Sequence, residues 1–105
     1  MKQRYIIGID PGVNTGIATW DRKEQTFMRI ECVKIHAAMK MVELFIQQYG
    51  IDDLFVRVED ASLRNWYGSA GREQLQGAGS IKRDSSIWRD YLKWLNIEHE
   101  MVALS

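Results

Sequence analysis

The hydrophobic and polar positions of the chain change period several times, and each change predicts a different element. Residues 4–10 are mostly apolar, as is typical of a buried strand, and a second short run follows at 16–20. Beyond a polar turn, Met28, Ile30 and Cys32 alternate with charged residues. We therefore expect three antiparallel strands, with the apolar side of the third strand, including Cys32, in the core.

The remaining pattern alternates helices with strands. Apolar positions recur at helical spacing from 36 to 49, where Gly50 predicts a C-terminal cap, and a strand follows at Leu54–Glu59. A long helix is expected up to about residue 95, and a final strand at 97–102. This order predicts an α/β fold: a mixed five-stranded sheet, first three strands antiparallel and then parallel crossovers, flanked by helices. The buried stripe of the long helix is expected to be Ile81, Trp88, Leu92 and Leu95.

A second apolar line runs along the same long helix. Ile87, Tyr91 and Trp94 lie beside the expected buried stripe, so the helix carries more apolar surface than a one-sided amphipathic helix needs. This line is a candidate surface for a homodimer. The alternative is that another segment of the same subunit covers it.

Composition sets mild bounds on the class of protein. With 105 residues and 46% hydrophobic content, the chain predicts a single domain over 1–105. Its one cysteine excludes an intramolecular disulfide, and two histidines beside it give no zinc-ligand spacing. No signal sequence or 18-residue apolar run is present, so we expect a soluble, cytoplasmic protein without membrane contact.

Two carboxylates close two of the predicted strands. Asp10 ends the first strand and is followed by the turn residues Pro11 and Gly12, and Glu59 ends the fourth. If these strands are parallel neighbours, ~4.8 Å apart, both carboxylates lie at one sheet edge and are most easily held together by Mg²⁺ or Mn²⁺. Asp60 points to the opposite strand face, and its role stays open between metal binding and orienting the next loop.

These motifs, in this order, resemble the ribonuclease H-like superfamily, and within it the RuvC-type Holliday-junction resolvases, particularly short phage or prophage versions. The matching stretches are the Gly-Ile-Asp-Pro-Gly turn at 8–12 with Thr15-Gly16, the acid-ended strand at 58–61, and the glycine-rich helix start at 71–80. The resemblance implies a metal-dependent endonuclease of DNA recombination and repair. In that reading Asp10 and Glu59 hold one or two Mg²⁺ ions, and a homodimer cuts a four-way junction.

The chain departs from that family at its C-terminus. The resemblance implies further acids from a C-terminal helix, whereas this sequence stops at Ser105. Either the natural protein continues, or it is a catalytically silent nucleic-acid-binding or assembly module of the same fold. Glu98 and Glu100 are possible substitutes, although surface glutamates are the favoured interpretation. Actin-like and sugar-kinase ATPases share a related glycine-rich turn but need a second phosphate loop and a second lobe, and neither is visible in these 105 residues.

The segment after Glu59 carries the basic bias of the chain. Residues 61–95 hold six basic and three acidic side chains, and basic and aromatic residues interleave at its start, which suits DNA phosphates and unpaired bases. The alternatives are aromatic packing over the core and, for Lys82 and Arg83, a solvated helix face. For Arg89 and Lys93 we favour the solvated face. The candidate DNA-binding residues are Arg64, Trp66, Tyr67, Arg72, Lys82 and Arg83.

Overall fold

The predicted order of elements is confirmed. The computed structural model describes the backbone of residues 1–60 and 72–103, and the side chains of residues 1–60 and 82–103. The helix expected at 36–49 begins one residue earlier, and the second and third strands extend beyond their predicted cores. The elements are β1 (Tyr5–Asp10), β2 (Asn14–Asp21), β3 (Thr26–Lys34), α1 (Ile35–Tyr49), β4 (Leu54–Glu59), α2 (Arg72–Leu95) and β5 (His99–Val102).

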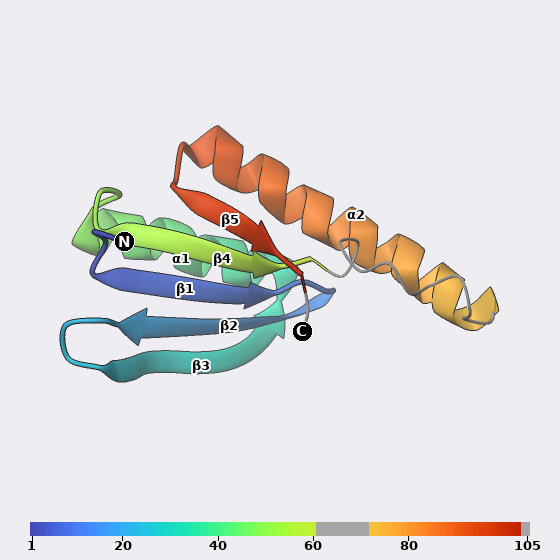
Figure 1. The fold of residues 1–105 in the computed structure, drawn as a ribbon, viewed down its shortest axis with the longest axis horizontal. Coiled ribbons are helices and arrows are strands. Elements are labelled where there is room, and N and C mark those ends of the chain that lie inside the picture. The colour runs from blue at the N-terminus through green and yellow to red at the C-terminus, as the bar shows by residue number, and fades with distance from the viewer. Residues whose placement is uncertain (61–71, 104–105) are drawn as a thin grey trace.

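The strands form one mixed sheet in the order β3-β2-β1-β4-β5 (Figure 1). The pairs β1–β2 and β2–β3 are antiparallel, whereas β1–β4 and β4–β5 are parallel. The two parallel pairs need crossovers, which α1 and α2 supply. The two edge strands of the sheet are therefore β3 and the short β5.

One face of the sheet and the two helices enclose the core. Along β1, Tyr5, Ile7 and Ile9 are buried, and the register places them beside the buried residues of β4. Burying a large apolar side chain contributes roughly 1.5–3 kcal/mol, so this layer is the main source of stability. The other core residues are Ile17, Ala38, Val42, Leu54, Val56, Val58, Trp88, Leu92 and Ile97.

The helices meet the sheet through the predicted stripes. Trp88 and Leu92 of α2 and Val42 of α1 are fully buried, whereas the side chain of Ile81 lies outside the described residues. Gly50, at φ 88°, caps α1 by donating its N–H to the Ile46 carbonyl. In the part of the chain that the structure describes, neither helix is long and apolar enough to span a bilayer.

The second apolar line of α2 is divided. Trp94 is 77% exposed and Ile87 is also exposed. Tyr91 instead turns to α1, where its hydroxyl donates to Glu43 Oε2 at 2.6 Å and lies 3.2 Å from the Met39 carbonyl. Burial and the Glu43 carboxylate raise the pKa of Tyr91 above its ordinary value. The line is therefore not one continuous exposed surface, because its central residue joins the two helices.

The prediction that Cys32 lies in the core is wrong. Cys32 is exposed and pairs with Gly16 of β2, on the face opposite to the buried residues Ile17 and Thr19. Charged Arg29 pairs with Thr19, on the helix-covered side. The orientation of β3 was predicted wrongly at these positions, because Ile30 and Cys32 turn toward the face that no described helix covers.

Candidate functional site

The candidate site is at the carboxyl ends of β1 and β4. Ile9 pairs with Val58, so Asp10 and Glu59 are the next positions on two neighbouring parallel strands. Both are exposed. They line a cleft of about 350 Å³ on the open face of the sheet. Its other lining residues are Gly8, Ile9, Gly16, Ile17, Ala18, Ile30, Glu31, Arg57 and Val102.

The turn that follows Asp10 is held by local hydrogen bonds. Thr15, which is fully buried, donates its hydroxyl to the Gly12 carbonyl at 2.7 Å. The Ile35 N–H donates to the Val13 carbonyl at 3.1 Å, which ties the turn to the start of α1. A Cβ on Gly12 would lie 3.0 Å from the Asn14 carbonyl oxygen, so a side chain there would need the turn backbone to shift by a few tenths of an ångström. The motif thus fixes the backbone beside Asp10.

A glycine on the adjacent strand makes room for the Asp10 side chain. Gly16 pairs with Asp10 across the β1–β2 ladder, and a Cβ there would lie 3.2 Å from the Asp10 Cβ. At Gly8, by contrast, a Cβ would meet nothing closer than the Ala18 carbonyl oxygen at 4.0 Å. The floor of the cleft is therefore built from small residues, and Gly16 is the one that directly determines the space around Asp10.

The three acids of the motif have different surroundings. No described residue gives the Asp10 carboxylate a hydrogen bond or an ion pair. Asp60 is buried at 6% exposure, whereas Glu59 is exposed, so the two do not share a face. The Asp60 N–H donates to the Val102 carbonyl at 2.7 Å and extends the contact between β4 and β5. Asp10 and Glu59 are thus the acids of this motif that face the cleft.

The two C-terminal glutamates are engaged elsewhere. Glu100 forms an ion pair with Arg57, its partner in the β4–β5 register, and Glu98 accepts a hydrogen bond from the Gln3 amide. Among the described residues, no group of three or more His, Cys, Asp or Glu side chains is placed to hold a metal ion. Asp10 and Glu59 together still fit Mg²⁺, which is commonly bound by one or two carboxylates together with waters and substrate phosphates.

Arg57 is a cleft residue that the sequence analysis missed. It precedes Glu59 by two positions on β4, and residues two apart on a strand point to the same face. That spacing was the signal available in the sequence. Arg57 thus brings a basic side chain to the cleft, and its guanidinium is paired with Glu100 of β5.

The structure places some of the predicted DNA-binding residues. Lys82 and Arg83 are exposed on α2, and Arg83 Nε lies 3.2 Å from Asp84 Oδ1. The first half of α2 projects past the carboxyl ends of β1 and β4 (Figure 1). Arg72 opens that helix, but its side chain is outside the described part. The remaining three candidates, Arg64, Trp66 and Tyr67, lie outside the described residues.

Comparison with known proteins identifies the fold. No protein-family model matches the sequence, and no curated protein matches it by sequence. Among solved structures, the chain is similar to RuvC of Thermus thermophilus, with a TM-score of 0.51 and 14% sequence identity. The match covers 94% of this chain and 63% of the RuvC chain. The protein therefore has a RuvC-like, ribonuclease H-like fold, over less than two thirds of the length of that structure.

Proposed function

We propose that the protein is a metal-dependent endonuclease that cuts branched DNA, with a four-way Holliday junction as its substrate. The observation that carries this proposal is the pair of exposed carboxylates, Asp10 and Glu59, on adjacent strand ends of a RuvC-like sheet. Ligands of open α/β sheets bind outside the carboxyl ends of the strands. The exposed cleft at this edge leaves room for a phosphate group.

In this proposal, Asp10 and Glu59 hold Mg²⁺ or Mn²⁺. The bound ion would polarise the scissile phosphate and lower the pKa of the attacking water. The chain's own contribution is positional. The Gly12–Thr15 turn keeps Asp10 at the strand end, and Gly16 leaves its carboxylate free to reach the ion. Arg57, held by Glu100, offers a positive charge beside the site for a DNA phosphate.

The proposed DNA contacts lie on α2 and the segment that precedes it. Lys82 and Arg83 would neutralise phosphates, and Trp66 or Tyr67 would stack on an unpaired base near Arg64 and Arg72. Replacing Arg72, Lys82 and Arg83 together by alanine should weaken junction binding and lower the salt slope by about one unit for each phosphate that is no longer neutralised. Fluorescence anisotropy at several salt concentrations measures this, and an unchanged slope would place the DNA surface elsewhere.

The catalytic proposal is tested with the Asp10→Asn and Glu59→Gln variants of the full encoded protein. Each should abolish cleavage of a labelled four-way junction in Mg²⁺ or Mn²⁺ while junction binding persists. EDTA should have the same effect on the unmodified protein. Asp52→Asn, which alters an exposed acid in the turn before β4, is the matched control and should cut normally. Undiminished cutting by Asp10→Asn would refute the proposal.

A second candidate function is a catalytically silent module that binds branched nucleic acid. It is favoured because no group of three or more acids among the described residues is placed to hold a metal ion. This candidate predicts junction binding that is insensitive to EDTA and to Asp10→Asn, without cleavage in any metal. The same gel assay therefore separates the two functions.

Junction cutting also bears on assembly. A four-way junction presents two symmetry-related strands, while one chain provides one pair of carboxylates, so the proposed enzyme acts as a homodimer with two-fold symmetry. The exposed part of α2, at Ile87 and Trp94, is one candidate surface for that dimer.

A further inference from the structure

Exposed apolar side chains gather along one edge of the molecule. Nine large hydrophobic residues in the described part of the chain are exposed, and five of them belong to β3 or α1. Ile30, at 67% exposure, is the most exposed of these five. On α2, Ile87 and Trp94 are separated by Tyr91, which turns to α1. The five residues on the β3 side are Phe27, Met28, Ile30, Leu44 and Tyr49.

The same side carries an unpaired strand edge. β3 is nine residues long and lies at the end of the sheet (Figure 1). Its backbone is hydrogen-bonded to β2 on one side, and no backbone hydrogen bond joins it to any other described segment. An open strand edge is a template for another strand, because its outward N–H and C=O groups have no partner within the protein.

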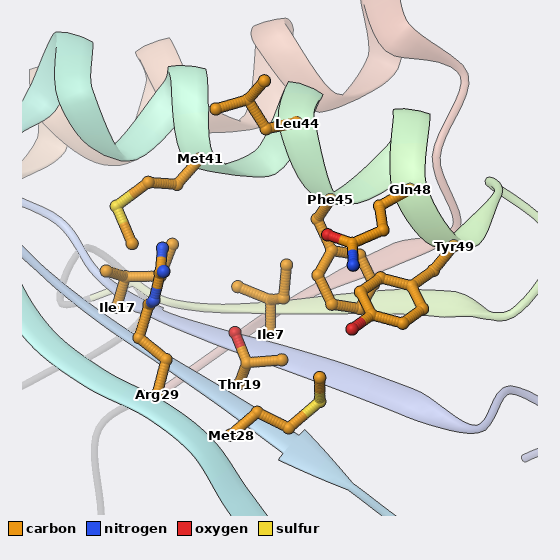
Figure 2. A pocket seen from close by; sticks show the side chains of 10 residues that line it. All are labelled: Ile7, Ile17, Thr19, Met28, Arg29, Met41, Leu44, Phe45, Gln48 and Tyr49. Carbon is orange, nitrogen blue, oxygen red and sulfur yellow. The ribbon is translucent and has the colours of Figure 1, made fainter.

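A cavity of about 270 Å³ lies between this edge strand and α1 (Figure 2). Its floor is formed by the buried residues Ile7, Ile17 and Thr19, and Met28 and Arg29 border it on the β3 side. The β2–β3 ladder shifts register between Thr19 and Trp20, which leaves Met28 as the extra residue of a β-bulge beside Arg29. The helix wall consists of Met41, Leu44, Phe45, Gln48 and Tyr49. The apolar surface thus continues from the strand edge onto α1.

Two opposite charges on β3 restrict which strand can pair with this edge. Arg29 Nε lies 3.1 Å from Glu31 Oε2, and both side chains are about half exposed. They stand two positions apart and so on the same face of the strand. In an antiparallel pair of identical strands, such a sequence is complementary to itself. The exposed Ile30 lies between them, on the other face.

We propose that β3 pairs with β3 of a second copy of this chain, antiparallel and about a two-fold axis at Ile30. With a two-fold axis perpendicular to the sheet, the helix-covered faces of both copies lie on the same side. Residues that face each other across the β3–β3 pair must therefore belong to the same face of the strand. Arg29 then faces Glu31 of the partner subunit, the reverse pair forms as well, and Ile30 packs against Ile30 of the partner subunit. Opposite charges on facing positions stabilise a strand pair, and like charges destabilise it.

The neighbouring registers are disfavoured by charge. Centring the pair on Arg29 places Arg29 opposite itself, and centring it on Glu31 places Glu31 opposite itself. The bulge and the charges of an edge strand commonly prevent indiscriminate pairing. Here the order of the charges leaves the Ile30-centred register as the favourable one of these three.

The pairing would extend the function proposed above, on which this step rests. Because the axis preserves the faces of the sheet, the clefts with Asp10 and Glu59 in both copies would open on the same side of a continuous sheet. A junction cut at two symmetry-related strands needs that arrangement. The α1 helices of the two copies would both lie on the opposite side of the sheet. There, each copy would cover the exposed Leu44 of the other and the cavity beside it.

Charge-reversed variants test the interface without DNA or metal. Arg29→Glu and Glu31→Arg each create like-charge pairs, so each should dimerise roughly tenfold more weakly or worse than the unmodified protein. An equimolar mixture of the two variants restores opposite charges and should form a heterodimer. Light scattering and native mass spectrometry measure this, with Lys93→Glu on α2 as the matched charge control.

Several outcomes would overturn the proposal. They are a monomeric unmodified protein at all concentrations, a dimer that both single variants leave intact, and a mixture that stays monomeric. A dimer lost on Trp94→Ala but kept in Arg29→Glu would assign the interface to α2. None of these results depends on nuclease activity, so failure of the interface is distinguishable from failure of the proposed function.

A cysteine cross-link tests the register independently. Ile30→Cys in a Cys32→Ser background places the new thiol opposite its own copy, and mild oxidation should yield a covalent dimer. In the same register, the native Cys32 residues are offset by about 13 Å along the strands, beyond disulfide reach. The unmodified protein should therefore not cross-link. Cross-linking through Cys32, or none through Ile30→Cys, would exclude the Ile30-centred pair.

Discussion

The two faces of the sheet are built from the same strands but differ in burial and in the side chains they carry. On the helix-covered face, β1 and β4 contribute Tyr5, Ile7, Ile9 and three aliphatic residues of β4, all buried. On the open face, the alternate positions of β1 are the half-buried Ile6, then Gly8 and the exposed Asp10. Because successive residues of a strand point to opposite faces, one segment supplies both the core and the candidate site. Stability and chemistry are thereby separated within a single strand.

The largest expected effect tests the covered face. Trp88→Ala removes a fully buried side chain and should reduce the free energy of unfolding by about 3–5 kcal/mol, measured by urea denaturation. Trp20→Ala on the other face should cost about 1 kcal/mol, mainly its edge contact with Phe27 at 4.8 Å. Equal losses in the free energy of unfolding at the two positions would contradict the conclusion that the helix-covered face is the main source of stability.

Trp88→Phe sharpens the same experiment. The Trp88 Nε1 is buried and has no hydrogen-bond partner among the described residues, and a buried donor without a partner costs free energy. Phenylalanine keeps most of the apolar ring and removes that donor. Its loss of stability should therefore be much smaller than that of Trp88→Ala. A comparable loss in both variants would show that Nε1 does have a partner in solution.

The next effect concerns the open face. Gly16→Ala places a methyl group 3.2 Å from the Asp10 Cβ, so it should displace that carboxylate and weaken Mn²⁺ binding by roughly tenfold. Gly8→Ala is the matched control, since its methyl group meets nothing closer than 4.0 Å. Calorimetric titration of Mn²⁺ measures both. Equal affinities in the two variants would mean that Asp10 does not bind the ion, whereas unfolding of Gly16→Ala would be detected by circular dichroism.

A smaller effect is expected where the helices of the covered layer meet. Tyr91→Phe removes the hydrogen bond to Glu43 and should lower the free energy of unfolding by about 1 kcal/mol, while Tyr49→Phe should change it little. Because the pKa of Tyr91 is raised in the folded protein, its contribution is complete below pH 10 and is lost as the pH rises further. Denaturation at pH 8 and pH 11 checks this, and an alkaline loss that persists in Tyr91→Phe would point to another group.

The smallest effect compares the carboxylates at the two ends of the first hairpin. Asp21 is buried, is bonded to Arg4 through both oxygens at 2.8 and 3.0 Å, and accepts backbone N–H bonds from Lys23 and Glu24. The Arg4 hydrogen bond and those N–H groups lower the pKa of Asp21 to about 2. Asp10 has no such partner among the described residues. One carboxylate is thus structural and the other is available to a ligand.

This contrast gives an acid dependence. A lowered pKa in the folded state stabilises the protein above the ordinary aspartate value of 3.8, and that contribution is lost as the pH falls toward 2. Asp21→Asn should be less stable at pH 6 and should lose less stability between pH 4 and pH 2 than the unmodified protein. Thermal unfolding over this range measures it, with Asp52→Asn as control. Parallel curves for all three proteins would contradict the assignment.

The sequence by itself determined the order of elements and the position of the two acids. Alternation and helical spacing depend on neighbours along the chain, so Leu54–Glu59 and the Gly50 cap were predicted correctly. The placement of Asp10 followed because a strand ending in an Asp-Pro-Gly turn fixes its last side chain at the sheet edge. That Asp10 and Glu59 lie at the same sheet edge required only that β1 and β4 be parallel neighbours.

Only the tertiary structure decided which face of each strand is covered. The alternation in β3 is the same whichever side the helices occupy, so no local pattern could show that Cys32 and Ile30 turn to the open face. Likewise, helical spacing placed Tyr91 in line with Trp94, but the position of α1 directed its hydroxyl to Glu43. Orientation depends on contacts between segments distant in sequence, and these are set by how the helices pack on the sheet.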